Sequence, residues 1–163
     1  RGSPDTPAGK EGAMAAIHQY EAQTRWRKGA EANPMNHRLT FGDRPAIEAS
    51  GAPQYKGDPG KLNPEELFVA ALVSCQMLSY LALAARGGVD VLAYEDAGRG
   101  TMTIADKRMR FTEVELRPRI TIAPGGDEAK ARALVEAAHH ACFIANSVSC
   151  AVRVEPEVVV AAG

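Results

Sequence analysis

The segment from residue 63 to residue 88 limits the fold of this 163-residue chain more than any other. Asn63 can cap a helix, Pro64 suits the first helical position, and Glu66 completes the spacing of a capping box. The helical pattern then continues unbroken to Arg86, where two glycines end it. The sequence therefore predicts one helix about 33 Å long, at a rise of 1.5 Å per residue.

Residues 67–85 of this helix carry no charge, which permits two interpretations. One is a membrane span, and the other is the buried centre of a globular protein. We favour the second, because Glu65 and Glu66 flank the segment instead of a basic cluster and the surrounding chain has the pattern of half-buried strands. We therefore expect no membrane partner. A single small sheet covers only one side of such a helix, so we expect a second copy of the chain to cover the rest in a homodimer.

The rest of the chain predicts strands on both sides of this helix and a second helix near the end. The second helix begins at residue 126 or 127 and reaches residue 138 or beyond. This order indicates an α+β fold, and the alternation of one apolar and one polar face favours an antiparallel sheet. Turns are expected at 42–45 and 124–126, and the strands are expected at residues 17–27, 38–41, 90–104, 109–122 and 151–160.

The composition bounds the domain and its environment. Residues 1–13 lack large apolar side chains, so we expect a disordered tail or a tag remnant, followed by a single domain over residues 14–163. A net charge of −1 gives no basic field for nucleic acid. Three cysteines are too few for a disulfide framework, and no secretion signal is visible, which together predict a reducing, cytoplasmic location.

The cysteines are the candidate reactive groups. Cys75 lies in the middle of the long helix, Cys142 at the end of the second, and Cys150 at the start of the last strand. A buried cysteine is most often a small inert hydrophobe. Two packed helices can nevertheless bring two such side chains within disulfide range, so that one thiolate attacks an oxidant and the other resolves the sulfenic acid.

Two sequence motifs carry a family resemblance. The run from Asn63 to Phe68, followed by two alanines and Cys75, resembles the first signature of the OsmC/Ohr family, the osmotically inducible and organic hydroperoxide resistance proteins. The segment from Cys142 to Ser147 is similar to the second-cysteine segment of that family. The resemblance implies a curved antiparallel sheet around two long central helices, an intertwined homodimer, and a thiol peroxidase that acts on organic hydroperoxides without a cofactor.

The same resemblance implies roles for individual residues. Cys75 corresponds to the peroxidatic cysteine, Cys142 to the resolving cysteine, and Glu65 to the acid that holds a catalytic arginine. That arginine stabilises the developing charge on the leaving oxygen. Arg38 is our first choice for it, although Arg25, Arg27, Arg44 and the cation Lys56 also lie in the right region. The disulfide is then reduced by a thiol reductant, which in the better-known members is a lipoylated protein.

Helix geometry adds a constraint on Glu65. Ten residues separate it from Cys75, a rise of about 15 Å along one helix, so the two cannot share one arginine within a straight helix. If both belong to one site, Glu65 comes from the partner chain. The alternative is that Glu65 only complements the positive end of the helix.

Other residues leave alternatives open. Gln76 is either a pocket hydrogen-bonding group or a satisfied buried amide. His139, His140 and Cys142 would need His18 or His37 to complete a zinc site, and adjacent histidines diverge by about 100° on a helix. We therefore expect no metal. The long helix also offers candidates for an apolar substrate pocket, each of which is equally a core residue: Phe68, Leu72, Met77 and Tyr80.

Two rival functions are also compatible with the sequence. One is a binding protein for small apolar ligands on the same scaffold, with a non-catalytic Cys75. The other is a structural dimer whose cysteines stay inert. No phosphate-binding loop, serine nucleophile elbow or dinucleotide fingerprint occurs in the sequence.

Overall fold

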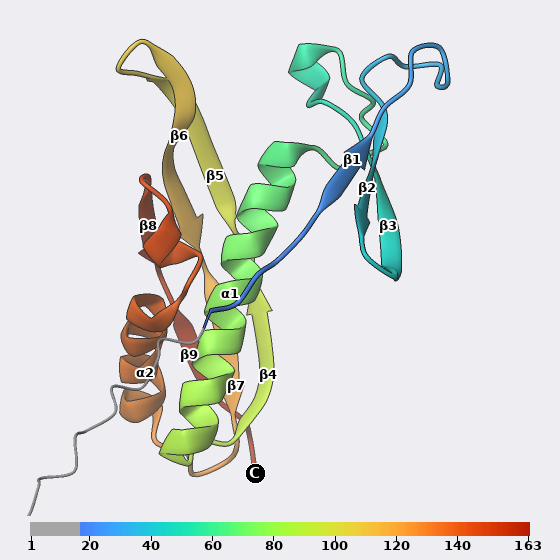
Figure 1. Ribbon diagram of the computed structural model, residues 1–163. Coiled ribbons are helices and arrows are strands. Elements are labelled where there is room, and N and C mark those ends of the chain that lie inside the picture. Colours follow the sequence, from blue (N-terminus) through green and yellow to red (C-terminus); the bar gives the residue numbers. More distant parts are fainter. Residues whose placement is uncertain (1–16) are drawn as a thin grey trace, which may run out of the picture.

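The computed structural model describes residues 17–163. The tail expected at residues 1–13, and the start of the domain expected at residue 14, lie outside the described residues. The described chain forms a long helix, α1 (Pro64–Gly87), a shorter helix, α2 (Glu128–Ala141), and nine strands. Figure 1 shows α2 and a bent sheet beside α1, with a separate small sheet near the first turn of α1.

The ends of α1 follow from its capping residues. The Oδ1 atom of Asn63 accepts a hydrogen bond from the backbone N–H of Glu66 at 2.9 Å. The Glu66 carboxylate in turn accepts from the Asn63 N–H at 3.1 Å. At the other end Gly88 takes a φ of 70°, which favours glycine. The predicted capping box and glycine stop are both confirmed.

One face of α1 is buried and the other is open. The buried residues recur every four positions, so they form a single stripe: Leu72, Gln76, Tyr80 and Ala84. On the opposite face Leu78 is 59% exposed. Within one chain α1 is therefore covered on one side only, as expected for a helix packed against a single small sheet. By length and composition alone, α1 could cross a membrane, and it is the one helix of residues 17–163 for which that is true.

Three of the predicted strands are each bent into two. The breaks fall side by side, because the Arg117 N–H donates to the Asp96 carboxylate at 2.8 Å and the Glu155 N–H donates to the Leu116 carbonyl at 2.8 Å. The bend divides one curved sheet into two halves with strand orders β4-β7-β9 and β5-β6-β8. The paired segments are β4 (Val91–Asp96) and β5 (Arg99–Ala105), β6 (Arg108–Leu116) and β7 (Pro118–Ile122), and β8 (Ala151–Val154) and β9 (Glu157–Val160).

The sheet is mixed. β4 pairs with β7 and β5 with β6 in antiparallel fashion, whereas β8 and β9 pair in parallel with β6 and β7. The parallel pairs arise because α2 carries the chain back across the sheet before the last strand, which is the connection that parallel pairing requires. The α+β class is confirmed, with a third strand that runs parallel instead of antiparallel.

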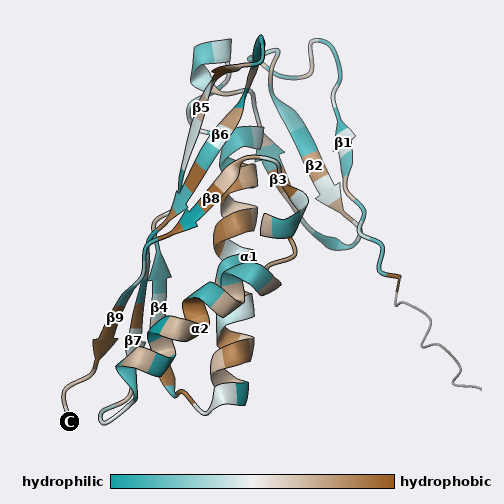
Figure 2. Ribbon diagram, turned by 90° about the vertical axis from the view of Figure 1, so that its left-hand side faces the viewer, coloured by the Kyte–Doolittle hydropathy of each residue, from teal (hydrophilic) through white to brown (hydrophobic). Residues whose placement is uncertain are grey.

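The core is divided between the two halves of the sheet. One apolar cluster packs Leu72 of α1 against Val114 and Leu116 of β6. The other packs Tyr80 and Ala84 of α1 against β7 and α2. The apolar face expected for residues 109–122 is buried throughout, including Pro118, which begins β7. Figure 2 shows apolar residues along α1 and along the strands that face it.

The amino-terminal sheet stands apart from this core. It contains β1 (Gln23–Arg25), β2 (His37–Phe41) and β3 (Arg44–Ala49) in an antiparallel meander. The strand expected over residues 17–27 is thus reduced to three residues. β3 begins where Arg44 and Pro45 indicated a turn, because the tight turn is made earlier, at Gly42. Neither apolar cluster contains a residue of this sheet.

A close approach of sheet to helix predicts the effect of one substitution. A Cβ atom at Gly98 would lie 2.5 Å from Val73 and 3.1 Å from Val69 of α1, whereas one at Gly87 would make ordinary contacts at 3.5 Å. We expect Gly98→Ala to lower the free energy of unfolding by about 1–3 kcal/mol through overpacking. Gly87→Ala is the matched control and should leave stability unchanged or slightly higher. Urea denaturation measures both, and equal stabilities would contradict the close approach.

Candidate redox site at the crossing of the two helices

Cys75 and Cys142 lie together although 67 positions separate them in the sequence. Cys142 is the residue that ends α2 and is only 1% exposed, whereas Cys75 is partly exposed. The Cys75 thiol lies close enough to Cys142 to raise the pKa of the Cys142 thiol. None of the three cysteines forms a disulfide, and Cys150 lies elsewhere, beside Phe68 and Phe111. The helix pair therefore brings together the two cysteines that the sequence analysis paired.

The packing of α1 against α2 produces this contact. The two helices run in opposite directions, because Gly87 at the end of α1 lies near Leu134 while Cys75 near its middle meets the end of α2. The Gln76 amide donates to the Val135 carbonyl at 3.2 Å and so links the two helices next to the cysteines. The register of the thiols is thus set by a buried hydrogen bond one residue away.

Burial controls the chemistry of Cys142. Desolvation, with the hydrogen bond to Cys75 as the second cause, raises the pKa of the Cys142 thiol to about 11. The Ala145 N–H, which donates to the Cys142 Sγ at 3.4 Å, acts in the opposite direction but is the weaker effect. Cys142 is therefore a protonated thiol at neutral pH, the form in which it can donate to a neighbouring thiolate.

A cluster of polar side chains that are buried or half-buried lies next to the thiols: Gln76, Tyr80, Tyr94 and Asp96. The rings of Tyr80 and Tyr94 are 5.8 Å apart, and the Tyr94 hydroxyl donates to the Asp96 carboxylate at 3.5 Å. Burial raises the pKa of both tyrosines and of Asp96. Within residues 17–163, the Gln76 Oε1 and the Tyr80 hydroxyl have no hydrogen-bond partner. Gln76 is thus a buried amide satisfied on one side only.

Cys75 opens into an apolar cleft of about 760 Å³ along α1. The pocket candidates chosen from the sequence lie elsewhere: Leu72 and Tyr80 are fully buried core residues, Phe68 stacks on Phe111, and Met77 faces a different groove. Sequence periodicity could not separate the cleft from the core, because α1 is apolar on all faces. The side chains that line the cleft around Cys75 include Leu78, Ala82, Leu83, Arg86, Phe143 and Ile144.

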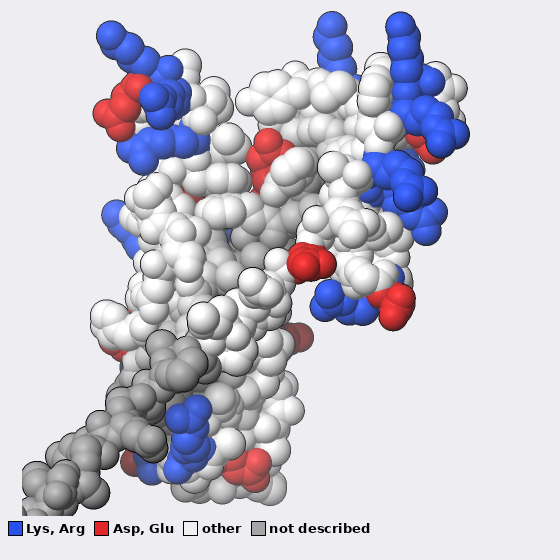
Figure 3. Space-filling view, in the orientation of Figure 1, with Lys and Arg blue, Asp and Glu red and all other residues white. Residues whose placement is uncertain are grey.

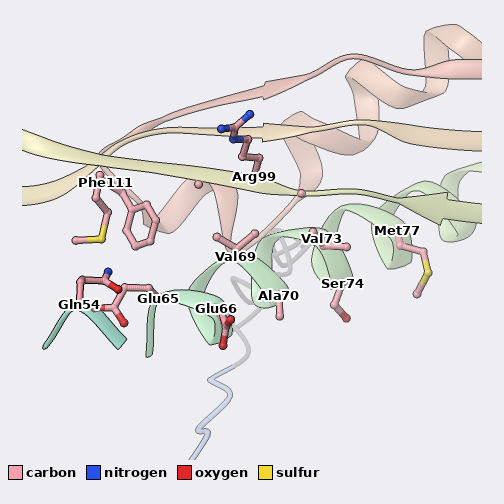
Figure 4. A pocket seen from close by; sticks show the side chains of 13 residues that line it. Gln54, Glu65, Glu66, Val69, Ala70, Val73, Ser74, Met77, Arg99 and Phe111 are labelled. Carbon is pink, nitrogen blue, oxygen red and sulfur yellow. The ribbon is translucent and has the colours of Figure 1, made fainter. Parts of the chain in front are cut away.

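Glu65 lies in a second groove, of about 890 Å³, between α1 and the β5–β6 half of the sheet. Figure 4 shows Glu65 beside Gln54 at one end of this groove, with Arg99 pointing away from it. The Oε2 atom of Glu65 is buried and has no hydrogen-bond partner within residues 17–163. Glu65 and Cys75 therefore open into different clefts of one chain, as the helix spacing predicted.

Arg38 also lies away from the cysteines within one chain. It sits on β2 directly opposite Arg25 of β1, and it forms an exposed ion pair with Glu48 at 3.5 Å. Arg44 donates to the Phe41 carbonyl at 2.8 Å. Figure 3 shows that lysine and arginine side chains gather over β1–β3. One chain thus assembles the two thiols but brings neither Glu65 nor Arg38 to them.

A metal site is not assembled within the described part of the chain. No group of three or more histidine, cysteine or acidic side chains there is placed to hold an ion. The ring centroids of His139 and His140 are 5.9 Å apart, and His140 pairs with Glu136 at 3.1 Å.

Comparisons with known proteins agree with this geometry. The family model described as OsmC-like protein matches residues 57–157. A search of curated proteins finds no match. An OsmC-like protein of unknown function from Vibrio cholerae shares 30% identity with a TM-score of 0.79, over 86% of this chain and 100% of the other.

Two more distant structures show the same fold. An organic hydroperoxide resistance protein OsmC from Legionella pneumophila has 20% identity and a TM-score of 0.65, over 88% of this chain and 98% of its own. An organic hydroperoxide resistance protein from Elizabethkingia anophelis has 18% identity and a TM-score of 0.70, over 91% of this chain and 100% of its own.

The buried position of Cys142 predicts its titration. In the variant Cys75→Ser/Cys150→Ser, the desolvation of Cys142 remains, so its thiol should titrate well above the value of about 8.5 that is ordinary for cysteine. Thiolate absorbance measures this, after subtraction of the signal from a variant that lacks all three cysteines. Unfolding the protein in urea should return the midpoint to the ordinary value. A folded-state midpoint at or below 8.5 would contradict the burial.

Proposed function

The chain belongs to the OsmC-like protein family, and we propose that it is a thiol peroxidase that reduces organic hydroperoxides with Cys75 and Cys142. The observation that carries this proposal is the contact between an accessible thiol in an apolar cleft and a buried thiol beside it. Relatives of the same fold that are named organic hydroperoxide resistance proteins support it. The odd count of three cysteines fits the cytoplasmic location that we propose for it.

In the first step the Cys75 thiolate attacks the outer oxygen of a hydroperoxide ROOH. The O–O bond breaks, an S–O bond forms, and the departing alkoxide takes a proton and leaves as the alcohol ROH. Cys75 is oxidised to the sulfenic acid and the peroxide is reduced. The apolar lining of the cleft favours an alkyl group on the peroxide over hydrogen peroxide, since it lowers the free energy of an apolar chain relative to water.

In the second step Cys142 resolves the sulfenic acid. Its sulfur attacks the Cys75 sulfur, the S–O bond breaks, and the hydroxyl leaves as water with the proton from the Cys142 thiol. The raised pKa of Cys142 keeps that proton on the thiol until this step. A dithiol reductant, for which a lipoylated protein is our candidate, then reduces the Cys75–Cys142 disulfide by exchange and is itself oxidised to a disulfide.

A second copy of the chain completes the site in this proposal. The β1–β3 sheet shares no core with the rest of the chain, and three strands need an apolar cover to be stable. The Oε2 atom of Glu65 lacks a donor within residues 17–163, and a buried carboxylate oxygen without one is costly. Arg25 and Arg38 stand opposite each other as like charges. A homodimer in which Arg38 of one copy reaches Glu65 of the other satisfies all three features.

A non-catalytic binding protein is the second candidate. Its supporting observation is that one chain places neither Arg38 nor Glu65 beside Cys75, so the thiol lacks these two groups unless a partner supplies them. Oxidation of the intact protein with an organic hydroperoxide separates this candidate from the peroxidase.

Oxidation of the intact protein tests the peroxidase. One equivalent of cumene hydroperoxide should remove two hydrogens from the mass and link Cys75 to Cys142, and should do so faster than hydrogen peroxide. Peptide mapping identifies the link. Cys150→Ser is the matched control and should behave like the native chain, because Cys150 lies away from the pair. An unchanged mass with both peroxides would contradict the peroxidase and favour the non-catalytic binding protein.

Mixed dimers test the shared site. Cys75→Ser and Glu65→Gln should each be inactive alone. After joint refolding, half of the dimers contain one of each chain, and in each of these one site has both Cys75 and Glu65. About a quarter of native activity should therefore return, measured as peroxide consumed. No recovery, in a sample shown by mass to contain mixed dimers, would place Glu65 outside a shared site.

A further inference from the structure

The Cys142 thiol lies on the side of α2 that faces the sheet. Ala138, one helical turn earlier, belongs to the buried cluster that contains Tyr80, and Tyr94 of β4 packs against that cluster. Residues four positions apart share one face of a helix, so Cys142 lies on the face of α2 that is turned toward Tyr94. Burial is the main cause that raises the pKa of Tyr94, and the nearby charges of Asp96 and Cys142 add to it. The Tyr94 hydroxyl therefore lies near the Cys142 sulfur.

The single hydrogen of the Tyr94 hydroxyl is directed to a carboxylate. It is donated to the Oδ2 atom of Asp96 at 3.5 Å. The other oxygen of this carboxylate, Oδ1, accepts the Arg117 backbone N–H at 2.8 Å at the bend of the sheet. Because a phenol has only one hydrogen to donate, the Tyr94 oxygen acts as an acceptor toward any other neighbour. An acceptor beside a thiol stabilises the protonated form and disfavours the thiolate.

This arrangement persists over the alkaline range in which Cys142 titrates. A carboxyl group is ionised there, even though burial raises the pKa of Asp96. Burial, with the Asp96 charge as the second cause, also raises the pKa of Tyr94, so the phenol keeps its hydrogen while the thiol loses its own. The acceptor that Tyr94 presents is thus a fixed feature of the folded chain.

Three further titratable side chains surround the same place. Cys75 lies beside Cys142 on α1, and His139 lies one turn earlier on α2, where its carbonyl accepts the Cys142 N–H at 3.2 Å. The ring of Tyr80 is 5.8 Å from that of Tyr94. The Tyr80 hydroxyl is fully buried and has no hydrogen-bond partner within residues 17–163. Of the two tyrosines, Tyr94 is therefore the one whose O–H direction is set by a partner in the described chain.

We propose that Asp96 and Tyr94 keep the proton on Cys142 in the reduced protein, so that Cys75 meets the peroxide as the thiolate. Asp96 fixes the Tyr94 hydrogen, and Tyr94 presents only an acceptor to the Cys142 thiol. Tyr94 keeps its hydrogen throughout, and the proton of Cys142 leaves with the departing hydroxyl of the resolving step. Both are positioning residues, since they act on the peroxide only through the thiols. Their effect on Cys142 rests on this geometry, whereas its consequence for peroxide reduction rests on the proposed function.

Asp96→Asn reverses the direction of the Tyr94 hydrogen bond. The Arg117 N–H retains the amide oxygen, so the amide nitrogen faces the Tyr94 oxygen and donates to it. The Tyr94 hydrogen is then free to donate to the Cys142 sulfur, which stabilises the thiolate. In the variant with Cys142 as its sole cysteine, Asp96→Asn should lower the pKa of Cys142 by about one unit or more. Thiolate absorbance measures the shift, after subtraction of the signal from the matching cysteine-free variant.

A double-mutant cycle tests whether Tyr94 transmits this effect. In Tyr94→Phe no hydroxyl remains to be turned, so Asp96→Asn should then shift the pKa of Cys142 by less than half as much. Tyr80→Phe is the matched control for the loss of a buried hydroxyl, and it should leave the full shift in place, because no residue of 17–163 bonds that hydroxyl. An undiminished shift in Tyr94→Phe would overturn the proposal. So would the absence of a shift in an Asp96→Asn protein that unfolds in urea as cooperatively as the native chain.

Glu95→Gln is the matched control for charge. Glu95 lies between Tyr94 and Asp96 on β4, and it is exposed on the opposite face of the strand. Its substitution removes one negative charge but leaves the Tyr94 hydrogen bond in place, so the pKa of Cys142 should stay unchanged. An equal fall of that pKa in Glu95→Gln and Asp96→Asn would overturn the proposal, because the loss of charge would then be the cause.

The pH profile of the resolving step tests the consequence for catalysis. After one equivalent of cumene hydroperoxide, dimedone traps the sulfenic acid that remains on Cys75, so its conversion to the disulfide is followed at each pH. The rate rises with the thiolate fraction of Cys142. In Asp96→Asn this rise should move to lower pH by the same shift as in the titration, whereas Glu95→Gln should follow the native profile.

The outcomes separate this proposal from the proposed function. If cumene hydroperoxide fails to oxidise the native protein, the peroxidase is wrong, while the titrations still decide the roles of Asp96 and Tyr94. If the protein is oxidised but the profile of Asp96→Asn does not move, the pair does not control the resolving thiol and the peroxidase stands.

Discussion

The packing of α1 against α2 is the interaction on which the rest of the structure depends. A single buried stripe of α1 supplies it, and the Gln76 amide fixes its register through the Val135 carbonyl. Because Cys75 is adjacent to Gln76 and Cys142 ends the facing helix, the same contact that stabilises the core also sets the distance between the two thiols. Structure and chemistry are therefore coupled at one crossing of two helices.

The bend of the sheet explains why the crossing of α1 and α2 is not covered on all sides. One half of the sheet covers the first half of α1 around Leu72, and the other half covers the second half of α1 around Tyr80. The cysteine pair lies between these two clusters along α1. At the bend Gly98 lets the sheet approach α1 closely, so the core closes on this side of the helix while the cleft at Cys75 opens on the opposite side.

Two charged features of the chain are unfavourable within a single copy. The amino-terminal sheet carries Arg25 and Arg38 opposite each other, and the first turn of α1 carries a buried carboxylate oxygen to which no group of residues 17–163 donates. Neither feature is favourable in isolation, because like charges repel and an unpartnered buried oxygen loses its hydrogen bonds to water. In the assembly that we propose, each feature supplies what the other lacks, and the unshared β1–β3 sheet gains an apolar surface to rest on.

The sequence by itself determined the local features. It predicted α1 with its capping box, α2 with Cys142 at its end, the buried face of residues 109–122, and the α+β class, because capping, periodicity and turn residues act over a few neighbouring positions. The motifs around Cys75 and Cys142 indicated the family. Tertiary structure alone decided the aligned breaks near Gly98 and Arg117, the parallel pairing of the last strand, and the open face of α1, because each depends on contacts between segments far apart in the chain. For the same reason Leu72 and Tyr80 proved to be core residues and the cleft formed around Leu78 and Arg86: on a helix that is apolar all round, only its neighbours decide which face remains open.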